Sequence, residues 1–371
     1  MKLRLFKIPG ALAGLAVVGS LYYPNLDQFF GRQNDFMPLY VAASLAGSGE
    51  LYDPAPYEAF ETERFGFTTQ IHYNRLPFYA ALLRPLAAFD YWTAYSIFTL
   101  TRFVALVGFL ALWTIPRRST AILWACWSFP LFGMFFGGQD VVIPLLGMAL
   151  AIHLHERGRG FAAGLAMTLF AVKFHLFVLA PLALLRRDRR EALYGFSIGV
   201  AALLGANAWV GGWDWPVKFL DAALLDTHEV QADTMPNLHG LMQEWPGAVW
   251  LEAAASIAVV AVTSLAVRKE SFAAALAFCV WGSLLISYHA YVADTLLLLP
   301  AALVLSANFE SDWAKYGNLL LLTPPLSIAL LSGRPASLAM QLMILAYFGA
   351  AAVTLVRRNS HADLEADQSP A

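Results

Sequence analysis

Long apolar stretches recur along this chain, and they constrain its fold more than any other feature. Such stretches include residues 91–115, 120–136, 192–210, 317–331 and 337–355. A helix of about 17 to 25 apolar residues crosses the ~30 Å hydrocarbon core of a bilayer. Charged residues make up only 13% of the 371 residues, about half their share in a soluble domain. The sequence therefore predicts an all-α polytopic membrane protein with about ten to twelve transmembrane helices.

Basic residues orient these helices, because cytoplasmic loops are enriched in Lys and Arg. The markers near the two ends place both termini in the cytoplasm; they are Lys2, Arg4, Lys7, Arg357 and Arg358. The first span then delivers residues 24–90 to the outer side as a long loop, and residues 211–247 form a second outer loop. We predict one multi-pass domain over residues 1–358 in the inner (plasma) membrane, followed by a disordered cytoplasmic tail over 359–371.

The first outer loop is predicted to hold two short amphipathic helices, over about Asp35–Ala46 and Pro77–Phe89. Pro54, Pro56 and Gly66 are expected to punctuate the connection between them. The position of Asp35 leaves two interpretations open. An aspartate there can cap the helix N-terminus, which is worth about 1 kcal/mol, or its carboxylate can carry chemistry.

A broken hairpin is predicted between two cytoplasmic markers. Only 26 residues separate Arg159 from the basic cluster 186–190, and two helices of about 13 residues would each reach only ~20 Å. We therefore expect a break near 172–175. Broken backbone at membrane depth is tolerated only inside protein or against a wet cavity, which places Lys173 and His175 in a cavity wall.

Most polar residues of the apolar region map to the outer half. An ionisable group within a span costs about 2.5 to 3.5 kcal/mol on insertion scales, so it usually faces the protein interior. One outward-facing polar pocket is the economical interpretation. Its candidates are Asp35, His72, Arg75, Gln139, Asp140, Lys173, His175, Asn237, His239, His289 and Asp294.

Simpler roles remain open for several of these candidates. Lys173 could only extend its ammonium to lipid headgroups, and His289 and Asp294 could be an interfacial group and a helix cap. Arg102 lies near the middle of a predicted span, where we expect it to pair with a carboxylate of the bundle.

Composition excludes several classes of function. The net charge of −2 offers no basic surface for nucleic acid. Both cysteines, Cys126 and Cys279, lie in apolar segments, which favours buried thiols over disulfides. The chain has no metal-ligand cluster at useful spacing, so we predict no metal and no cofactor.

Several short motifs occur in an order that resembles glycosyltransferase family 87. This family comprises polytopic GT-C-type enzymes that use polyprenyl-phosphate sugars and includes α-mannosyltransferases acting on phosphatidylinositol mannosides. The matching residues are Asn34-Asp35-Phe36 with Tyr40, Tyr52-Asp53-Pro54, Leu76-Pro77-Phe78, Gly138-Gln139, Arg157 to Gly160, Val172-Lys173-Phe174, the cluster Arg186 to Arg190, Met235 to Gly240, Ser287-Tyr288-His289 and Asp294.

This resemblance implies a GT-C-like helix bundle and a hexosyltransferase, with mannose as the expected sugar and an active site on the extracytoplasmic face. Asp35 would be the catalytic base, and the reaction would invert the anomeric centre. The implied partners are a polyprenyl-phosphate sugar donor, a lipid or glycan acceptor and membrane lipids. The residues expected to bind substrate are Tyr40, His72, Arg75, Gln139, Lys173, His175, Asn237, His289 and Asp294.

Two other classes of function remain open from the sequence. Broken helices with polar residues at membrane depth also occur in transporters and flippases, although the chain shows no inverted internal repeat. A non-catalytic membrane subunit that retains the family's motifs is the third possibility.

Overall fold

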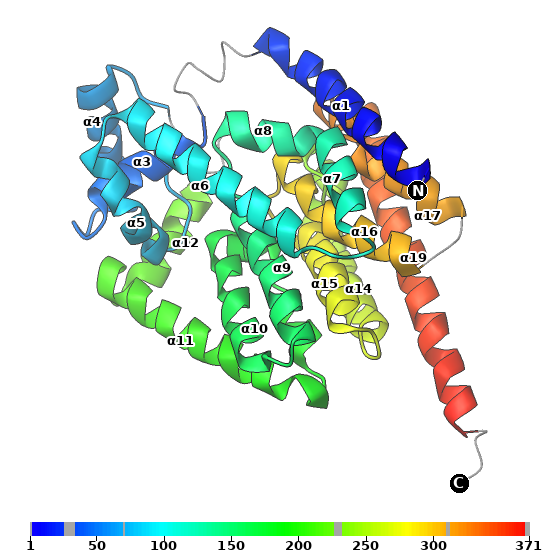
Figure 1. Cartoon of the computed structure of the whole chain (residues 1–371). Coiled ribbons are helices and arrows are strands. Elements are labelled where there is room, and N and C mark those ends of the chain that lie inside the picture. The colour runs from blue at the N-terminus through cyan, green and yellow to red at the C-terminus, as the bar shows by residue number, and fades with distance from the viewer. Residues whose placement is uncertain (1, 26–33, 70, 226–231, 309–311, 368–371) are drawn as a thin grey trace.

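The structure is a computed structural model that describes residues 2–25, 34–69, 71–225, 232–308 and 312–367. These residues form helices and connecting turns, with no β-strand among them (Figure 1). The prediction of an all-α membrane protein is confirmed. The helices, with η denoting a 3-10 helix, are α1 (Lys2–Tyr22), η1 (Tyr23–Asn25), α3 (Phe36–Leu45), α4 (Pro54–Phe65), α5 (Pro77–Leu83), η2 (Arg84–Ala88), α6 (Tyr91–Leu112), α7 (Arg118–Trp127), α8 (Phe129–Gly137), α9 (Val142–Glu156), α10 (Gly160–Ala166), η3 (Met167–Leu176), η4 (Ala180–Leu184), η5 (Arg187–Arg189), α11 (Arg190–Gly211), α12 (Trp215–Leu225), η6 (Ala232–Thr234), α13 (Leu238–Met242), α14 (Ala248–Ala266), α15 (Phe272–Ile286), η7 (Val292–Leu297), α16 (Leu298–Asn308), α17 (Asp312–Leu322), α18 (Pro324–Leu331) and α19 (Ala336–Asp367).

Four helices in the described part of the chain are long and apolar enough to cross a bilayer, namely Tyr91–Leu112, Arg187–Gly211, Ala248–Ala266 and Ala336–Arg358. The bent pair α7–α8 raises this number to five. Full-length spans are thus fewer than the ten to twelve expected, because several predicted spans are broken or are shorter helices. In the apolar window of Ala248–Ala266 only 11% is buried by protein, as expected for a helix that faces lipid.

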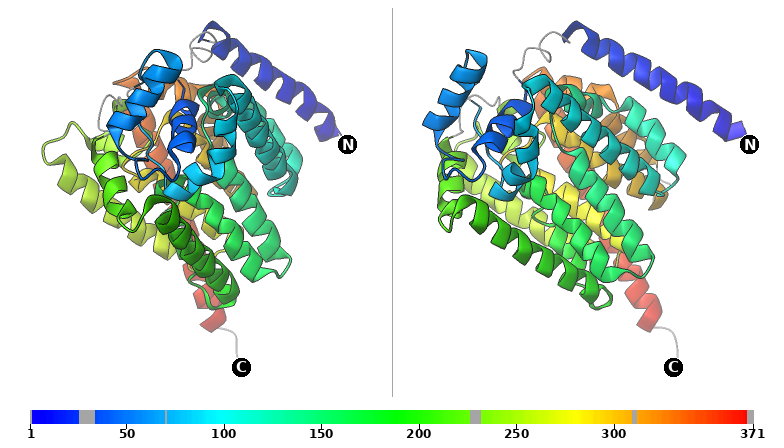
Figure 2. Two further views of the ribbon diagram at one scale, coloured as in Figure 1. Left: turned by 90° about the vertical axis from the view of Figure 1, so that its left-hand side faces the viewer. Right: turned by 60° about the vertical axis from the view of Figure 1, so that its left-hand side comes forward.

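The first outer loop folds into a compact group of helices at one end of the molecule (Figures 1 and 2). The two expected helices are present as α3 and as α5 continued by η2. The structure corrects the connection between them, which contains the 12-residue helix α4. Pro54 stands at its first position, where a missing N–H costs nothing, and Gly66 ends it with a positive φ of 77°.

Two predicted spans are broken in the structure. Residues 120–136 were expected to form one helix but divide at Ser128 into α7 and α8, bent by 67°. Pro130 cannot continue a helix from the preceding turn because it lacks an N–H, and the Ser128 hydroxyl accepts a hydrogen bond from Leu131 N. Thr323 and Pro324 likewise separate α17 from α18 within the predicted span 317–331.

The predicted break near 172–175 is found at Lys173. Its φ of −134° and ψ of 55° are non-helical and interrupt η3, which continues α10. The chain then returns through η4 rather than through a second regular helix. The short chain length between Arg159 and the basic cluster 186–190 is therefore accommodated by irregular backbone at Lys173.

At the C-terminus, α19 continues as a helix to Asp367 and projects from the end opposite the first outer loop (Figure 1). The sequence predicts disorder from residue 359. The backbone is instead helical as far as Asp367, in a stretch containing Ala, Leu and Glu, which favour helix.

The broken hairpin is held against α11 by two glycines. A Cβ on Gly164 would lie 1.9 Å from the Ala192 carbonyl oxygen, and one on Gly195 would lie 2.0 Å from the Phe161 oxygen. Such a contact between backbones is possible only without side chains, as in small-residue packing of membrane helices. This contact fixes α10, and therefore Lys173, relative to α11.

We predict that Gly164→Ala lowers stability, because the added methyl group meets backbone that cannot move aside cheaply. Overpacking of this kind costs about 1 to 3 kcal/mol. The loss is measured as a lower Tm by size-exclusion fluorescence after heating in detergent. Gly205→Ala is the matched control, since Gly205 lies on α11 with nothing within 4 Å of its Cβ position. Equal melting of the two variants would contradict the packing account.

Candidate active site

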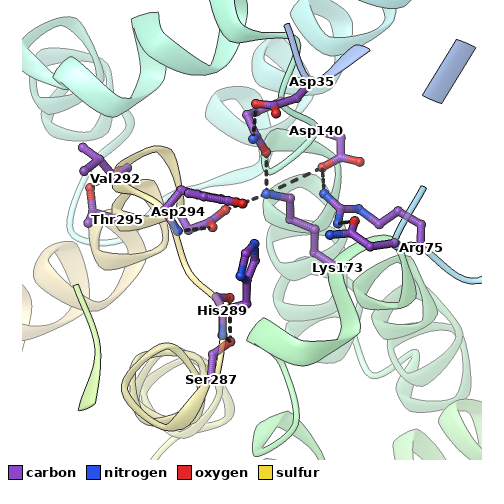
Figure 3. Close-up of polar contacts among 12 residues, drawn as sticks. Asp35, Arg75, Asp140, Lys173, Ser287, His289, Val292, Asp294 and Thr295 are labelled. Carbon is purple, nitrogen blue, oxygen red and sulfur yellow. Dashed lines mark hydrogen bonds and ion pairs between the residues drawn. The ribbon is translucent and has the colours of Figure 1, made fainter. Parts of the chain in front are cut away.

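Five segments that are distant in sequence bring charged and amide side chains together (Figure 3). Asp35 precedes α3, Arg75 precedes α5, Gln139 and Asp140 lie in the turn after α8, Lys173 lies at the break in η3, and Asp294 lies in η7. We call these six residues the polar cluster. Six of the eleven candidates for an outward-facing polar pocket thus lie together in the structure.

The Gln139 amide links a carboxylate to an ammonium group. Its Nε2 donates a hydrogen bond to Asp35 Oδ2, and its Oε1 accepts one from Lys173 Nζ at 2.6 Å. The Gln139 carbonyl faces the Lys173 ammonium and its N–H group faces the Asp35 carboxylate, so both ends of the amide are hydrogen-bonded. Asp35 and Lys173 are thereby held on opposite sides of a single side chain.

Lys173 is buried and has several partners. Its side chain is 2% exposed, and Nζ lies 2.7 Å from Asp294 Oδ1 and 3.9 Å from Asp140 Oδ1. A buried ammonium is costly unless it is paired and hydrogen-bonded. The break at Lys173 therefore points the charge into the bundle toward acceptors, and the alternative of a lysine reaching out to lipid headgroups does not apply.

Asp294 has two roles in the cluster. One carboxylate oxygen accepts from Lys173, while the other accepts from the Tyr291 backbone N–H at 2.8 Å. The second bond belongs to a capping box at the start of η7. The capping function expected as an alternative for Asp294 is thus present together with its pairing to Lys173.

Asp140 belongs to the cluster; it was a candidate for the polar pocket but not one of the residues expected to bind substrate. It is 1% exposed, and neither carboxylate oxygen has a hydrogen-bond partner among the described residues. Its nearest cation is Arg75, whose Nη2 lies 3.7 Å away. The signal in the sequence was its neighbour Gln139, because both residues directly follow Gly137-Gly138, the glycine turn at the end of α8.

Asp35 does not cap α3. Its side chain makes no cap hydrogen bond, and Asn34 Oδ1 accepts from Phe36 N at 3.0 Å instead. The Asp35 backbone N–H donates to the Gly137 carbonyl at 2.9 Å, which docks the start of α3 on the glycine turn. The local interpretation of Asp35 as an N-cap is therefore wrong, and its carboxylate is directed to Gln139.

Burial raises the pKa of the Asp35 carboxyl above its ordinary value, while Lys173 and the Gln139 hydrogen bond oppose this increase. The cluster contains three aspartates and two basic side chains. Mutual repulsion among the carboxylates is strong in a low-dielectric setting. A raised pKa makes Asp35 a better proton acceptor near neutral pH than an ordinary aspartate.

Arg102 supports the glycine turn from behind. It is fully buried, and Nη1 donates to the carbonyl oxygens of Met134 at 2.7 Å and of Gln139 at 3.3 Å, while its guanidinium lies 4.8 Å from the Phe98 ring centroid. The expectation that Arg102 pairs with a carboxylate is wrong within the described part of the chain. The Met134 carbonyl also accepts from the backbone N–H groups of Gly138 and Gln139, so the guanidinium is a further donor there. It also supplies a donor to the Gln139 carbonyl, which lies beyond the end of the helix.

Five predicted site residues are not members of the cluster, and three of them make contacts elsewhere. Tyr40 donates its hydroxyl to the Phe89 carbonyl at 2.7 Å within an aromatic core. His72 lies 3.4 Å from Glu58, and Asn237 caps α13 while donating to the Ser287 carbonyl at 2.6 Å. These contacts position loops. His175 and His289 lie beside the cluster and line an adjoining cavity.

Among the described residues, no group of three or more His, Cys, Asp or Glu side chains is placed to hold a metal ion. Lys173 and Arg75 interleave with the three aspartates of the cluster. On one side of the Gln139 amide, the Asp35 carboxylate can accept a proton. On the other side, the Lys173 ammonium can donate hydrogen bonds.

Comparison with known protein families matches residues 76–287 to glycosyltransferase family 87, which is more than half of the 371 residues. The chain belongs to glycosyltransferase family 87. Comparisons with curated proteins and with solved structures gave no match. Together with its apolar helices, membership in the family makes the protein a membrane glycosyltransferase, which acts on a sugar donor and an acceptor.

The family match includes Gln139, Asp140, Lys173 and His175, and it ends before His289. Asp35 precedes the matched region, so its place in the cluster comes from the geometry above.

We predict that Arg102→Met destabilises the family 87 protein by about 1 to 3 kcal/mol, the usual penalty for leaving a buried polar group unpaired. Arg102→Lys retains one donor and should lose less. The Tm of the two variants in detergent checks this order. A methionine variant that melts like the unmodified protein would show that the carbonyl groups of the glycine turn do not need Arg102.

Proposed function

We propose that this protein transfers a hexose, with mannose as the proposed sugar, from a polyprenyl-phosphate donor to a lipid or glycan acceptor on the extracytoplasmic face of the inner membrane. The observation that carries the proposal is the Gln139 bridge. It holds the Asp35 carboxylate, which does not cap a helix, close to the buried Lys173 ammonium. Family membership supports the reaction class. The resemblance of the motifs supports the donor and the sugar.

Asp35 is the proposed general base. The acceptor hydroxyl oxygen attacks the anomeric carbon, and its proton passes to the Asp35 carboxylate. The bond from the anomeric carbon to the phosphate oxygen breaks, and its electron pair leaves with the polyprenyl phosphate. A single displacement of this kind inverts the anomeric configuration, as in inverting glycosidases.

The leaving group needs no general acid. A phosphate monoester has a second pKa of about 6, so the departing oxygen is stable without a proton at neutral pH. Developing negative charge is stabilised by cationic donors aimed at the phosphate. Lys173 and Arg75 are the two cations of the polar cluster, and they are the proposed contacts of the donor phosphate.

Replacing Asp35 with Asn should lower transfer by about 10² to 10⁴-fold, the usual contribution of a positioned base. Transfer is measured from a labelled polyprenyl-phosphate mannose in proteoliposomes. Asp90→Asn is the matched control, because Asp90 caps α6 from the exposed surface and asparagine caps equally well.

Three outcomes separate the candidate functions. Turnover by Asp35→Asn equal to that of the unmodified protein would remove Asp35 as the base. Movement of the labelled lipid across the bilayer without a covalent product would favour a flippase. A lack of both in the unmodified protein, with this donor and with other hexose donors, would favour a non-catalytic subunit.

Gln139→Ala should shift the acidic limb of the pH–rate profile to higher pH. The Gln139 N–H lowers the pKa of the Asp35 carboxyl, so its removal raises that pKa, and the carboxylate becomes protonated at a higher pH. Since the base must be unprotonated, activity is lost earlier as pH falls. The measurement is kcat/KM against pH, and an unshifted acidic limb would contradict the role of the bridge.

A further inference from the structure

A cavity of about 250 Å³ adjoins the polar cluster and has no role in the proton transfer described above. Its walls come from η3, α12 and the turn after α15, and they include Phe174, His175, Phe219, Tyr288 and His289. Figure 3 shows that His289 and Asp35 lie on opposite sides of Lys173. The part of the cavity wall formed by His289 therefore adjoins the Lys173 ammonium group.

The cavity wall carries no Asp, Glu, Lys or Arg side chain among the residues that the structure describes. The charged groups are gathered instead in the polar cluster next to it. A phosphate would be drawn to the cations, where charge-assisted hydrogen bonds are strong. The cavity itself suits a polar ligand without charge.

Aromatic rings form much of this wall. The ring centroids of Phe174 and Phe219 lie 5.8 Å apart in an edge-to-face arrangement, and those of Tyr288 and His239 lie 4.5 Å apart. The electron-rich face of an aromatic ring attracts positively polarised hydrogens, such as the C–H groups on one face of a pyranose. Pockets of this type combine apolar walls with a few placed polar groups.

Histidines supply those polar groups. Nε2 of His289 is buried and has no hydrogen-bond partner in the described structure. Burial lowers the pKa of His289 to about 4, so its imidazole is neutral at pH 7 and offers one donor and one acceptor. His239 is engaged through Nδ1 with Glu252 at 3.0 Å. An unpaired neutral imidazole matches a hydroxyl group better than an anion.

We propose that this cavity binds one uncharged hexopyranose unit, with Tyr288, Phe174 and Phe219 against the ring and His289 on a hydroxyl. Its volume supports a small ligand such as a single ring, since 250 Å³ lies just below the ~300 to 1,000 Å³ of most ligand pockets. The choice of a sugar among neutral polar ligands rests on the proposed function. The unit belongs either to the donor or to the acceptor.

The test measures binding and needs no turnover. Methyl α-mannopyranoside is titrated against the full chain in nanodiscs by saturation-transfer NMR, since detergents with sugar headgroups would compete. We expect saturable binding that sorbitol does not displace. Tyr288→Ala should weaken it by about tenfold, the equivalent of the 1.4 kcal/mol that an aromatic contact can supply.

Tyr194→Ala is the matched control. Tyr194 and Tyr288 are 62% and 61% exposed, but Tyr194 lies on α11 outside the cavity wall. Binding that is unchanged in Tyr288→Ala, or weakened equally in both variants, would overturn the assignment. A lack of saturable binding of methyl mannoside, methyl glucoside and methyl galactoside would overturn it as well.

The source of the sugar is separated by competition. If the cavity holds the donor's sugar, a short-chain polyprenyl-phosphate mannose displaces the glycoside; if it holds the acceptor's sugar, both bind together. Either result supports the cavity as a sugar site. Glycoside binding without any sugar transfer by the unmodified protein would count against the proposed function alone, whereas transfer without glycoside binding would count against this cavity alone.

Discussion

The bridge made by the Gln139 amide is the interaction on which the arrangement of the site depends. It joins the start of the first outer loop to the broken hairpin, because Asp35 is bonded to one end of the amide and Lys173 to the other. The remaining parts of the fold bring these three groups together. The glycine turn after α8 docks on the start of α3 through Gly137 and Asp35, and Arg102 holds the same turn from the opposite side.

Two breaks in the membrane helices place the side chains of the polar cluster, which continuous helices could not bring together. The break at Lys173 directs an ammonium into the bundle, and the bend between α7 and α8 delivers the glycine turn to the outer loop. Both breaks are surrounded by protein, as is required where backbone groups leave helical pairing at membrane depth. The close contact of Gly164 and Gly195 then fixes the hairpin in place.

The sequence predicted the features that follow from length and charge. The break at Lys173 was found because the number of residues between two cytoplasmic markers is too small for two spans, and this is a geometric constraint. The number of full spans and the helix α4 were mispredicted, because proline both interrupts a helix and starts one. Arg102 could not be assigned, since its partners are backbone carbonyl groups and these leave no signature in a sequence. Tyr40 and Asn237 were expected to bind substrate, and both instead donate to backbone carbonyl groups, while the Asn237 amide oxygen also accepts from the Gly240 N–H.

The most direct test of the account is a structure of the protein in a nanodisc with a non-transferable polyprenyl-phosphonate sugar. The account predicts the phosphonate oxygens within about 2.7 to 2.9 Å of the Lys173 ammonium, the range of charge-assisted hydrogen bonds. It also predicts that the Asp35 carboxylate faces the anomeric carbon from the side opposite the phosphonate. A phosphonate bound away from Lys173, or an Asp35 that lies on the leaving-group side, would contradict it.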